Sequence, residues 1–87
     1  MLEGTTTLAR IGLDRITFHP GVLGGKACIR GMRMTAGQII DLVADGLTTA
    51  QIIDDFPDLE PEDIRQALEF GALLARQENL LRELQSA

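Results

Sequence analysis

Three helix-start signals in the second half of the chain constrain its fold more than any other feature. Thr35 is followed three positions later by Gln38, and Thr48 by Gln51. At this spacing a hydroxyl and an amide side chain satisfy each other's free backbone N–H groups. Pro61 gives a third start, because the N–H that proline lacks would have no partner in a first turn. The sequence therefore predicts three short helices joined by brief turns.

The residues around these starts predict where the helices end and which faces they bury. Gly46 stands where a left-handed residue closes the first helix, and Pro57 stops the second. Glu62 and Asp63 lie in the first turn of the third helix, where negative charge complements the helix dipole. The apolar face of the third helix is predicted to consist of Ile64, Ala67, Leu68, Gly71, Ala72 and Ala75. After Arg76 the apolar residues are Leu80, Leu81 and Leu84, with Leu73 before them.

The residues before Thr35 predict a small β element. Residues 14–19, DRITFH, alternate polar and apolar side chains and include β-branched residues, the pattern of a short strand. Residues 28–30 and 32–34 suit a second and a third short strand on either side of Gly31. Strands this short need each other, a helix or a second chain for support. Met32 and Met34 are expected to fill core space, and the turns need positive φ at Gly24, Gly25 and Gly31.

These elements predict one domain of the mainly α (α+β) class. Residues 14–76 are expected to form a short β element followed by a three-helix helix-turn-helix unit. Residues 1–13 carry no clear pattern and are predicted to be a loose arm. Residues 77–87 are predicted to be a helical extension or a tail.

Composition narrows the class of protein further. Aromatic residues make up 3% of the chain and all are Phe, so the core must be aliphatic, and so small a core favours a homodimer. No apolar stretch approaches the roughly 20 residues of a membrane span, and the first residues lack the basic-then-apolar order of a signal peptide. The one cysteine, Cys28, cannot form an internal disulfide. We therefore expect a small cytoplasmic protein with no membrane partner.

Charge is unevenly distributed. Residues 1–40 carry five basic and two acidic side chains, a balance of +3, and residues 41–87 carry three basic and eleven acidic, a balance of -8. One interpretation is two surfaces with different partners, or two protomers that meet head to tail. The other is that the acids solvate the helices and the basic residues are scattered.

The basic residues Lys26, Arg30 and Arg33 lie in the glycine-rich stretch HPGVLGGKACIRGMRM. Its GGKA segment is not a phosphate-binding P-loop. That motif needs a glycine and a hydroxyl residue at the positions that Pro20 and Ala27 occupy.

Three segments together carry a resemblance to a known family. They read DRITFHPGVLGGKACIRGMRMT, LVADGLTTAQIIDDFPDL and EPEDIRQALEFGALLA, and they lie between Asp14 and about Arg76. In this order and spacing they closely resemble the family numbered 433 among domains of unknown function. The chain departs from the family pattern at a few positions. Ala27 stands where the family often has Pro, Met34 stands where it usually has Ile, and Phe70-Gly71 stands where Tyr-Ala is common.

The resemblance implies a homeodomain-like helix-turn-helix fold. It also implies a non-catalytic antitoxin of the VapB type, encoded beside a PIN-like or Mut7-C-like toxin ribonuclease. Such an antitoxin binds its toxin and represses their shared operon through operator DNA. A stand-alone DNA-binding regulator, or a structural adaptor whose helix-turn-helix no longer binds DNA, remain the alternatives.

The sequence leaves open which residues would contact DNA or a protein partner. In a helix-turn-helix the last helix enters the major groove, but here it begins with acids, and only Arg65 and Gln66 nearby suit base reading. Lys26, Arg30 and Arg33 of two protomers offer six charges to DNA. Toxin binding could instead use an inserted Arg30 or Arg33 that pairs with carboxylates of the toxin, or the leucine-bearing C-terminal helix laid into a groove of the toxin. The third interpretation is that both arginines pair with the acidic helices of this chain.

No enzymatic, metal or cofactor site is expected. His19 is the single histidine and precedes a proline, and a Cys28–His19 pair lacks an obvious third member. The acidic run does not have the glycine and ligand order of a calcium loop, and helix-end acids account for most of it. The run consists of Asp54, Asp55, Asp58, Glu60, Glu62 and Asp63.

Overall fold

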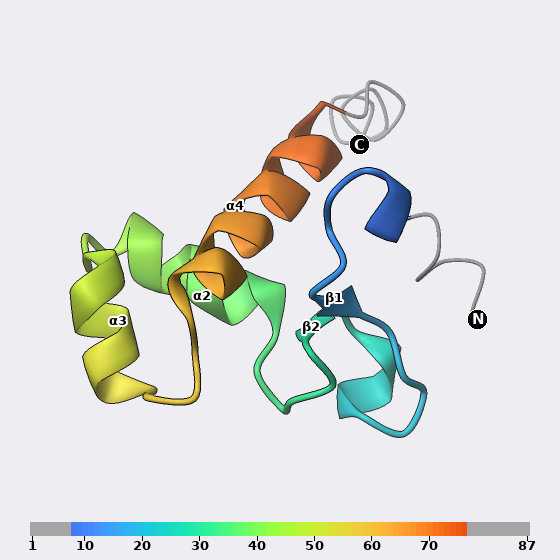
Figure 1. The fold of residues 1–87 in the computed structure, drawn as a ribbon, viewed down its shortest axis with the longest axis horizontal. Helices are drawn as coiled ribbons and strands as arrows, with labels where there is room; N and C mark the ends of the chain where they lie inside the picture. Colours follow the sequence, from blue (N-terminus) through green and yellow to red (C-terminus); the bar gives the residue numbers. More distant parts are fainter. Residues whose placement is uncertain (1–7, 77–87) are drawn as a thin grey trace, which may run out of the picture.

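A computed structural model describes residues 8–76 and shows a mixed α+β fold in which a two-stranded sheet precedes three α-helices (Figure 1). The expected fold class is confirmed. Residues 8–10 are also helical. In chain order the elements are β1 (Ile16–Thr17), the 3-10 turn η1 (Leu23–Gly25), β2 (Cys28–Ile29), α2 (Ala36–Ala44), α3 (Thr49–Asp55) and α4 (Pro61–Ala75).

Both predicted capping boxes are present and fix where α2 and α3 begin. The Thr35 hydroxyl accepts from the N–H of Gln38 at 3.0 Å, and the Gln38 side chain accepts from the N–H of Thr35 at 2.8 Å. Thr48 and Gln51 repeat this at 3.1 and 2.8 Å. Gly46 has the predicted positive φ, at 98°. Local sequence therefore sets the helix boundaries.

The sheet has two strands and not the three that the sequence predicted. Within residues 8–76, β1 pairs antiparallel with β2, and residues 32–34 form no strand. Arg30 and Gly31 both have positive φ, 49° and 74°, and the N–H of Met32 donates to the C=O of Ile29 at 2.8 Å. These are the features of a tight type I′ turn. The N–H of Ile29 also donates to the C=O of Met34 at 2.9 Å, so residues 32–33 loop out between the two bonds.

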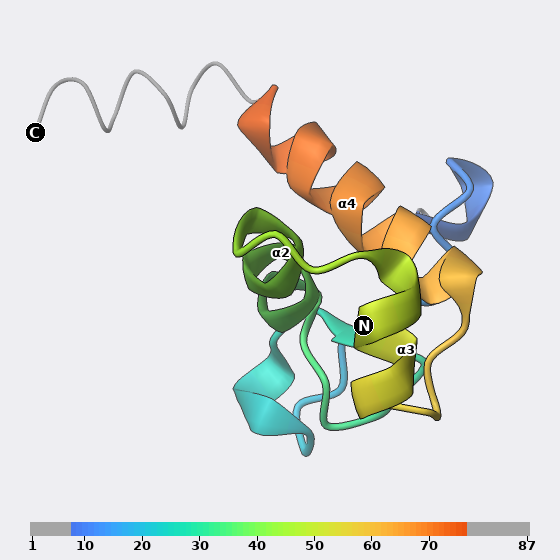
Figure 2. The same cartoon turned by 90° about the vertical axis from the view of Figure 1, so that its left-hand side faces the viewer.

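Helices α2 and α4 pack against each other, as Figures 1 and 2 show from two sides, and the core includes residues of both helices, of α3 and of both strands. Leu8 and Leu13, expected in a loose arm, are buried in this core at 9% and 1% exposure. Residues 1–7 of that arm and the predicted extension at 77–87 lie outside the described residues. The core cluster consists of Leu8, Leu13, Ile16, Ile29, Ala36, Ile39, Ile52, Leu59, Ile64 and Ala67.

The buried face of α4 is rotated from the predicted one. Ile64 and Ala67 are buried as expected, but Leu68 is 39% exposed. Asp63 and Gln66 are buried in its place. Two polar side chains thus take core positions, and each needs hydrogen-bond partners there.

Candidate interaction surface

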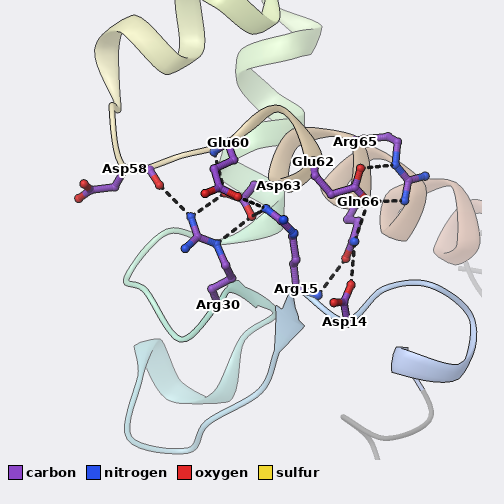
Figure 3. Close-up of polar contacts among 9 residues, drawn as sticks. All are labelled: Asp14, Arg15, Arg30, Asp58, Glu60, Glu62, Asp63, Arg65 and Gln66. Atoms are coloured by element: carbon purple, nitrogen blue, oxygen red, sulfur yellow. Dashed lines mark hydrogen bonds and ion pairs between the residues drawn. The ribbon is translucent and has the colours of Figure 1, made fainter.

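A buried carboxylate at the start of α4 binds two arginines from the β region (Figure 3). Asp63 is fully buried. Its Oδ1 accepts from Arg15 Nη1 and from Arg30 Nε, both at 3.0 Å, and its Oδ2 accepts from Arg30 Nη2 at 2.8 Å. The two bonds from Arg30 form the bidentate fork that guanidinium groups make with carboxylates. We call these residues, with Glu60, the Asp63 cluster.

The Asp63 cluster ties the turn after β2 to the connection between α3 and α4. Glu60 accepts from Arg15 Nη1 at 2.6 Å, and its own N–H donates to Asp63 Oδ2 at 2.8 Å. Arg30 Nη2 also donates to the C=O of Asp58 at 2.8 Å. Arg30 therefore holds two segments that are far apart in the sequence.

A second polar group lies beside this cluster. Gln66 is 2% exposed, and its side chain accepts from the N–H of Arg15 at 2.9 Å. It donates to Asp14 at 2.9 Å and to Glu62 at 2.8 Å. Arg65 forks onto Glu62 at 2.9 and 2.7 Å. The residues suited to base reading on α4 are therefore bound within the chain.

These contacts change the acidity of two carboxyl groups. Burial alone raises the pKa of Asp63, but hydrogen bonds from Arg30, the Glu60 N–H and Arg15 outweigh it, and the pKa lies below its ordinary value. Hydrogen bonds from Arg65 and then from Gln66 lower the pKa of Glu62 to about 2. Both groups therefore stay charged in the folded chain at pH values where they take up protons in the unfolded chain.

We expect acid to destabilise the protein through these two groups. Because their pKa values are depressed in the folded state, their contribution is complete above the unfolded values of about 4 and is lost as the pH falls through the folded values. The free energy of unfolding, measured by urea titration, should decrease from about pH 4 to about pH 2. The double variant Asp63→Asn, Glu62→Gln should show a shallower decrease, and an unchanged slope would contradict this assignment.

The structure separates the five candidate contact residues into two groups. Arg30, Arg65 and Gln66 have partners within the chain. The interpretation that Arg30 and Arg33 both pair with acids of this chain is confirmed for Arg30 and, among residues 8–76, is wrong for Arg33. Lys26 and Arg33 are exposed and make no ion pair with another residue in the 8–76 range. A role for any of the five in binding DNA or a partner stays a prediction.

The sequence reasoning missed Asp63 and Arg15 as the centre of a cluster. Asp63 lies three positions after Glu60, which is the spacing of the capping box that the structure shows. This spacing was the sequence signal that could have marked Asp63 as a bonded residue. Nothing local marks Arg15, because its partners lie 45 and 48 residues away.

An apolar groove lies between the looped-out residues and the end of α3. One hollow of about 280 Å³ lies beside a second of about 200 Å³, and Met34 and Phe56 line both. We call this the Met34 groove. Met32 and Met34 also pack partly against the core, as expected. The lining residues are Met32, Arg33, Met34, Gln38, Asp41, Leu42, Asp55, Phe56, Pro57, Asp58 and Leu59.

Within residues 8–76, no three His, Cys, Asp or Glu side chains are placed to hold a metal ion together. Among the helices in the same range, none has the length and hydropathy needed to cross a bilayer.

Comparison with known proteins identifies the fold. A family model described as "Protein of unknown function (DUF433)" matches residues 16–71. The crystal structure of a DUF433 member protein from Anabaena variabilis ATCC 29413 superposes with a TM-score of 0.64. The alignment covers 97% of this chain and 81% of that one, at 23% sequence identity. No curated protein matches.

Proposed function

The chain belongs to the DUF433 family of proteins of unknown function, and on that premise we propose that it is a non-catalytic, antitoxin-like binding protein. Its proposed main ligand is a PIN-like toxin ribonuclease, which it neutralises. Operator DNA is the proposed second ligand. The observation that carries this order of ligands is that Arg30, Arg65 and Gln66 are occupied within the chain.

DNA reading by α4 is disfavoured by its contacts. In a helix-turn-helix, the N-terminal side chains of the last helix hydrogen-bond to base edges. Here Gln66 is buried and the Arg65 fork is bound to Glu62. The first turn of α4 carries Glu62 and Asp63 and no basic residue, so it offers no cation of its own to the DNA phosphates. A protein ligand is therefore the better match.

The exposed features suit a protein ligand. The Met34 groove offers apolar surface, and Arg33 is one of the residues that line it. Lys26 is exposed in the same glycine-rich segment. Because PIN-like nucleases hold metal with carboxylates, an exposed arginine beside an apolar contact supports inhibition by bidentate pairing.

A secondary role in DNA binding rests on the same two cations. Lys26 and Arg33 have no ion-pair partner in the described range, and a homodimer would present both twice. Such binding would use phosphates and depend steeply on salt. It is compatible with autoregulation of a toxin–antitoxin operon.

A tagged pull-down from the native host, with bound protein and bound DNA both identified, tests the proposal. We expect a small ribonuclease in stoichiometric amount, and we expect the purified chain to suppress its cleavage of RNA in a fluorescence assay. Recovery of promoter DNA alone would overturn the proposal and favour a stand-alone regulator. Recovery of neither would favour a structural adaptor.

A further inference from the structure

We propose that the Met34 groove is the docking site for a basic amphipathic segment of a protein partner. The segment would place apolar side chains in the two hollows and lysine or arginine side chains on the rim. This inference rests on the proposed function, because it names the surface through which the chain would bind a protein. The groove's shape, its anchoring and its charge each support it.

The shape of the groove suits side chains of a helix. Its two hollows, of about 280 and 200 Å³, are each smaller than the roughly 300–1,000 Å³ of a typical small-molecule site. Since both are lined by Met34 and Phe56, they lie next to each other. An amphipathic helix fills such neighbouring hollows with apolar residues spaced three or four positions apart. Phe56 is 39% exposed, and methionine side chains adapt to varied partners.

The two walls of the groove are held together by the Asp63 cluster. One wall is the looped-out segment that begins with Met32, two residues after Arg30. The other wall is the segment from Asp55 to Leu59 after α3. Arg30 bridges them, because it forks onto Asp63 and donates to the C=O of Asp58 (Figure 3). The groove is therefore formed before a partner arrives, which reduces the entropy lost on binding.

The charge of the rim selects a cationic occupant. Asp41, Asp55 and Asp58 line the groove against one basic residue, Arg33. None of these three carboxylates makes an ion pair with any residue of the described part of the chain. The last turn of α3 contains no basic residue, so its free carbonyls add negative potential. A second copy of this chain fits less well, because its net charge is -5.

Methionine-methyl NMR of the full chain tests this docking site. The chain has three methionines, and two of them line the groove. The probe is an amidated helical peptide of about four turns, with leucine at i, i+3, i+4 and i+7 and lysine elsewhere. We expect it to shift the methyl signals of Met32 and Met34. A matched peptide with glutamate in place of lysine should leave both unchanged.

Variants separate groove binding from nonspecific attraction. The double variant Asp55→Asn, Asp58→Asn removes rim charge at exposed positions and should weaken peptide binding about threefold to tenfold. Phe56→Ala should weaken it about fivefold or more. Leu74→Ala, at an apolar residue 44% exposed on α4, should leave the affinity unchanged.

Three results would overturn the docking site. They are equal binding of the glutamate peptide, an unchanged affinity in both groove variants, and methyl shifts that depend on protein concentration without peptide. The last would identify a second copy as the occupant. The docking site and the proposed function can fail separately. If the Phe56→Ala variant and the Asp55→Asn, Asp58→Asn variant still capture a host ribonuclease at full affinity, the groove is not the docking site, but the antitoxin function stands. If the groove binds the peptide specifically but no host ribonuclease is recovered, the docking site stands and the antitoxin function fails.

Discussion

Asp63→Ala is expected to destabilise the folded chain by about 3 kcal/mol, because removing one partner of a buried ion pair costs roughly 3–5 kcal/mol. The variant loses the acceptor of three arginine hydrogen bonds and of the Glu60 N–H. Arg15 and Arg30 then lie close together without the carboxylate between them. Their side chains are 26% and 37% exposed, so water compensates in part, and we expect the lower end of the range. Urea unfolding followed by circular dichroism measures the loss.

Glu69→Ala on the same helix is the matched control. Glu69 approaches Arg76 at 3.7 Å, and both side chains are about half exposed or more, at 48% and 62%. Such pairs contribute about 0–1 kcal/mol. In a cycle with Arg30→Ala, the arginine substitution should cost much less in the Asp63→Ala background than in the original chain. A loss for Asp63→Ala no greater than for Glu69→Ala would show that the cluster does not stabilise the fold.

The uneven charge of the sequence is explained in part by this cluster. Arg15 and Arg30 belong to the basic first part of the chain, and Glu60 and Asp63 to the acidic second part. The fold brings the two parts together, so some of the asymmetry serves internal pairing and does not mark two external surfaces. Among the charged residues outside the cluster, Lys26 and Arg33 are exposed, and so are the acids Asp41, Asp55 and Asp58 that line the groove with Arg33.

The helices could be predicted because their signals are local. A capping box involves residues three positions apart, and the two boxes predicted at Thr35 and Thr48 are both present. Pro61 likewise begins α4. In such cases the residues that set the structure are neighbours in the sequence, and no knowledge of distant packing is needed.

The sheet and the cluster could be predicted only in part because they depend on distant contacts. Alternation placed Arg30 outward on a strand, but a positive φ at Arg30 puts it in a turn that aims it at Asp63, 33 residues away. Asp63 and Gln66 share a face of α4 with Ala67, and their polarity excluded them from the predicted core. Only their partners, Arg15 and Asp14 among them, make that burial favourable.

Ile39→Ala is expected to destabilise the protein by about 3 kcal/mol, within the range of roughly 2–5 kcal/mol for such truncations in cores. Ile39 is fully buried on α2, the helix that packs most extensively against α4. The variant loses apolar contacts and leaves a cavity that helices joined by short turns can close only in part. Urea unfolding should give a lower midpoint with an unchanged slope. A domain of this kind has only about 5–15 kcal/mol of stability in total, so the effect on the midpoint should be large.

Leu68→Ala on α4 provides the comparison, because it removes a similar number of atoms from a side chain 39% exposed. It should cost about 1 kcal/mol or less. Ile39→Val, which removes a single methylene, should cost about 0.5–1.5 kcal/mol. If Ile39→Ala and Leu68→Ala had equal effects, the contact between α2 and α4 would not be the centre of the core.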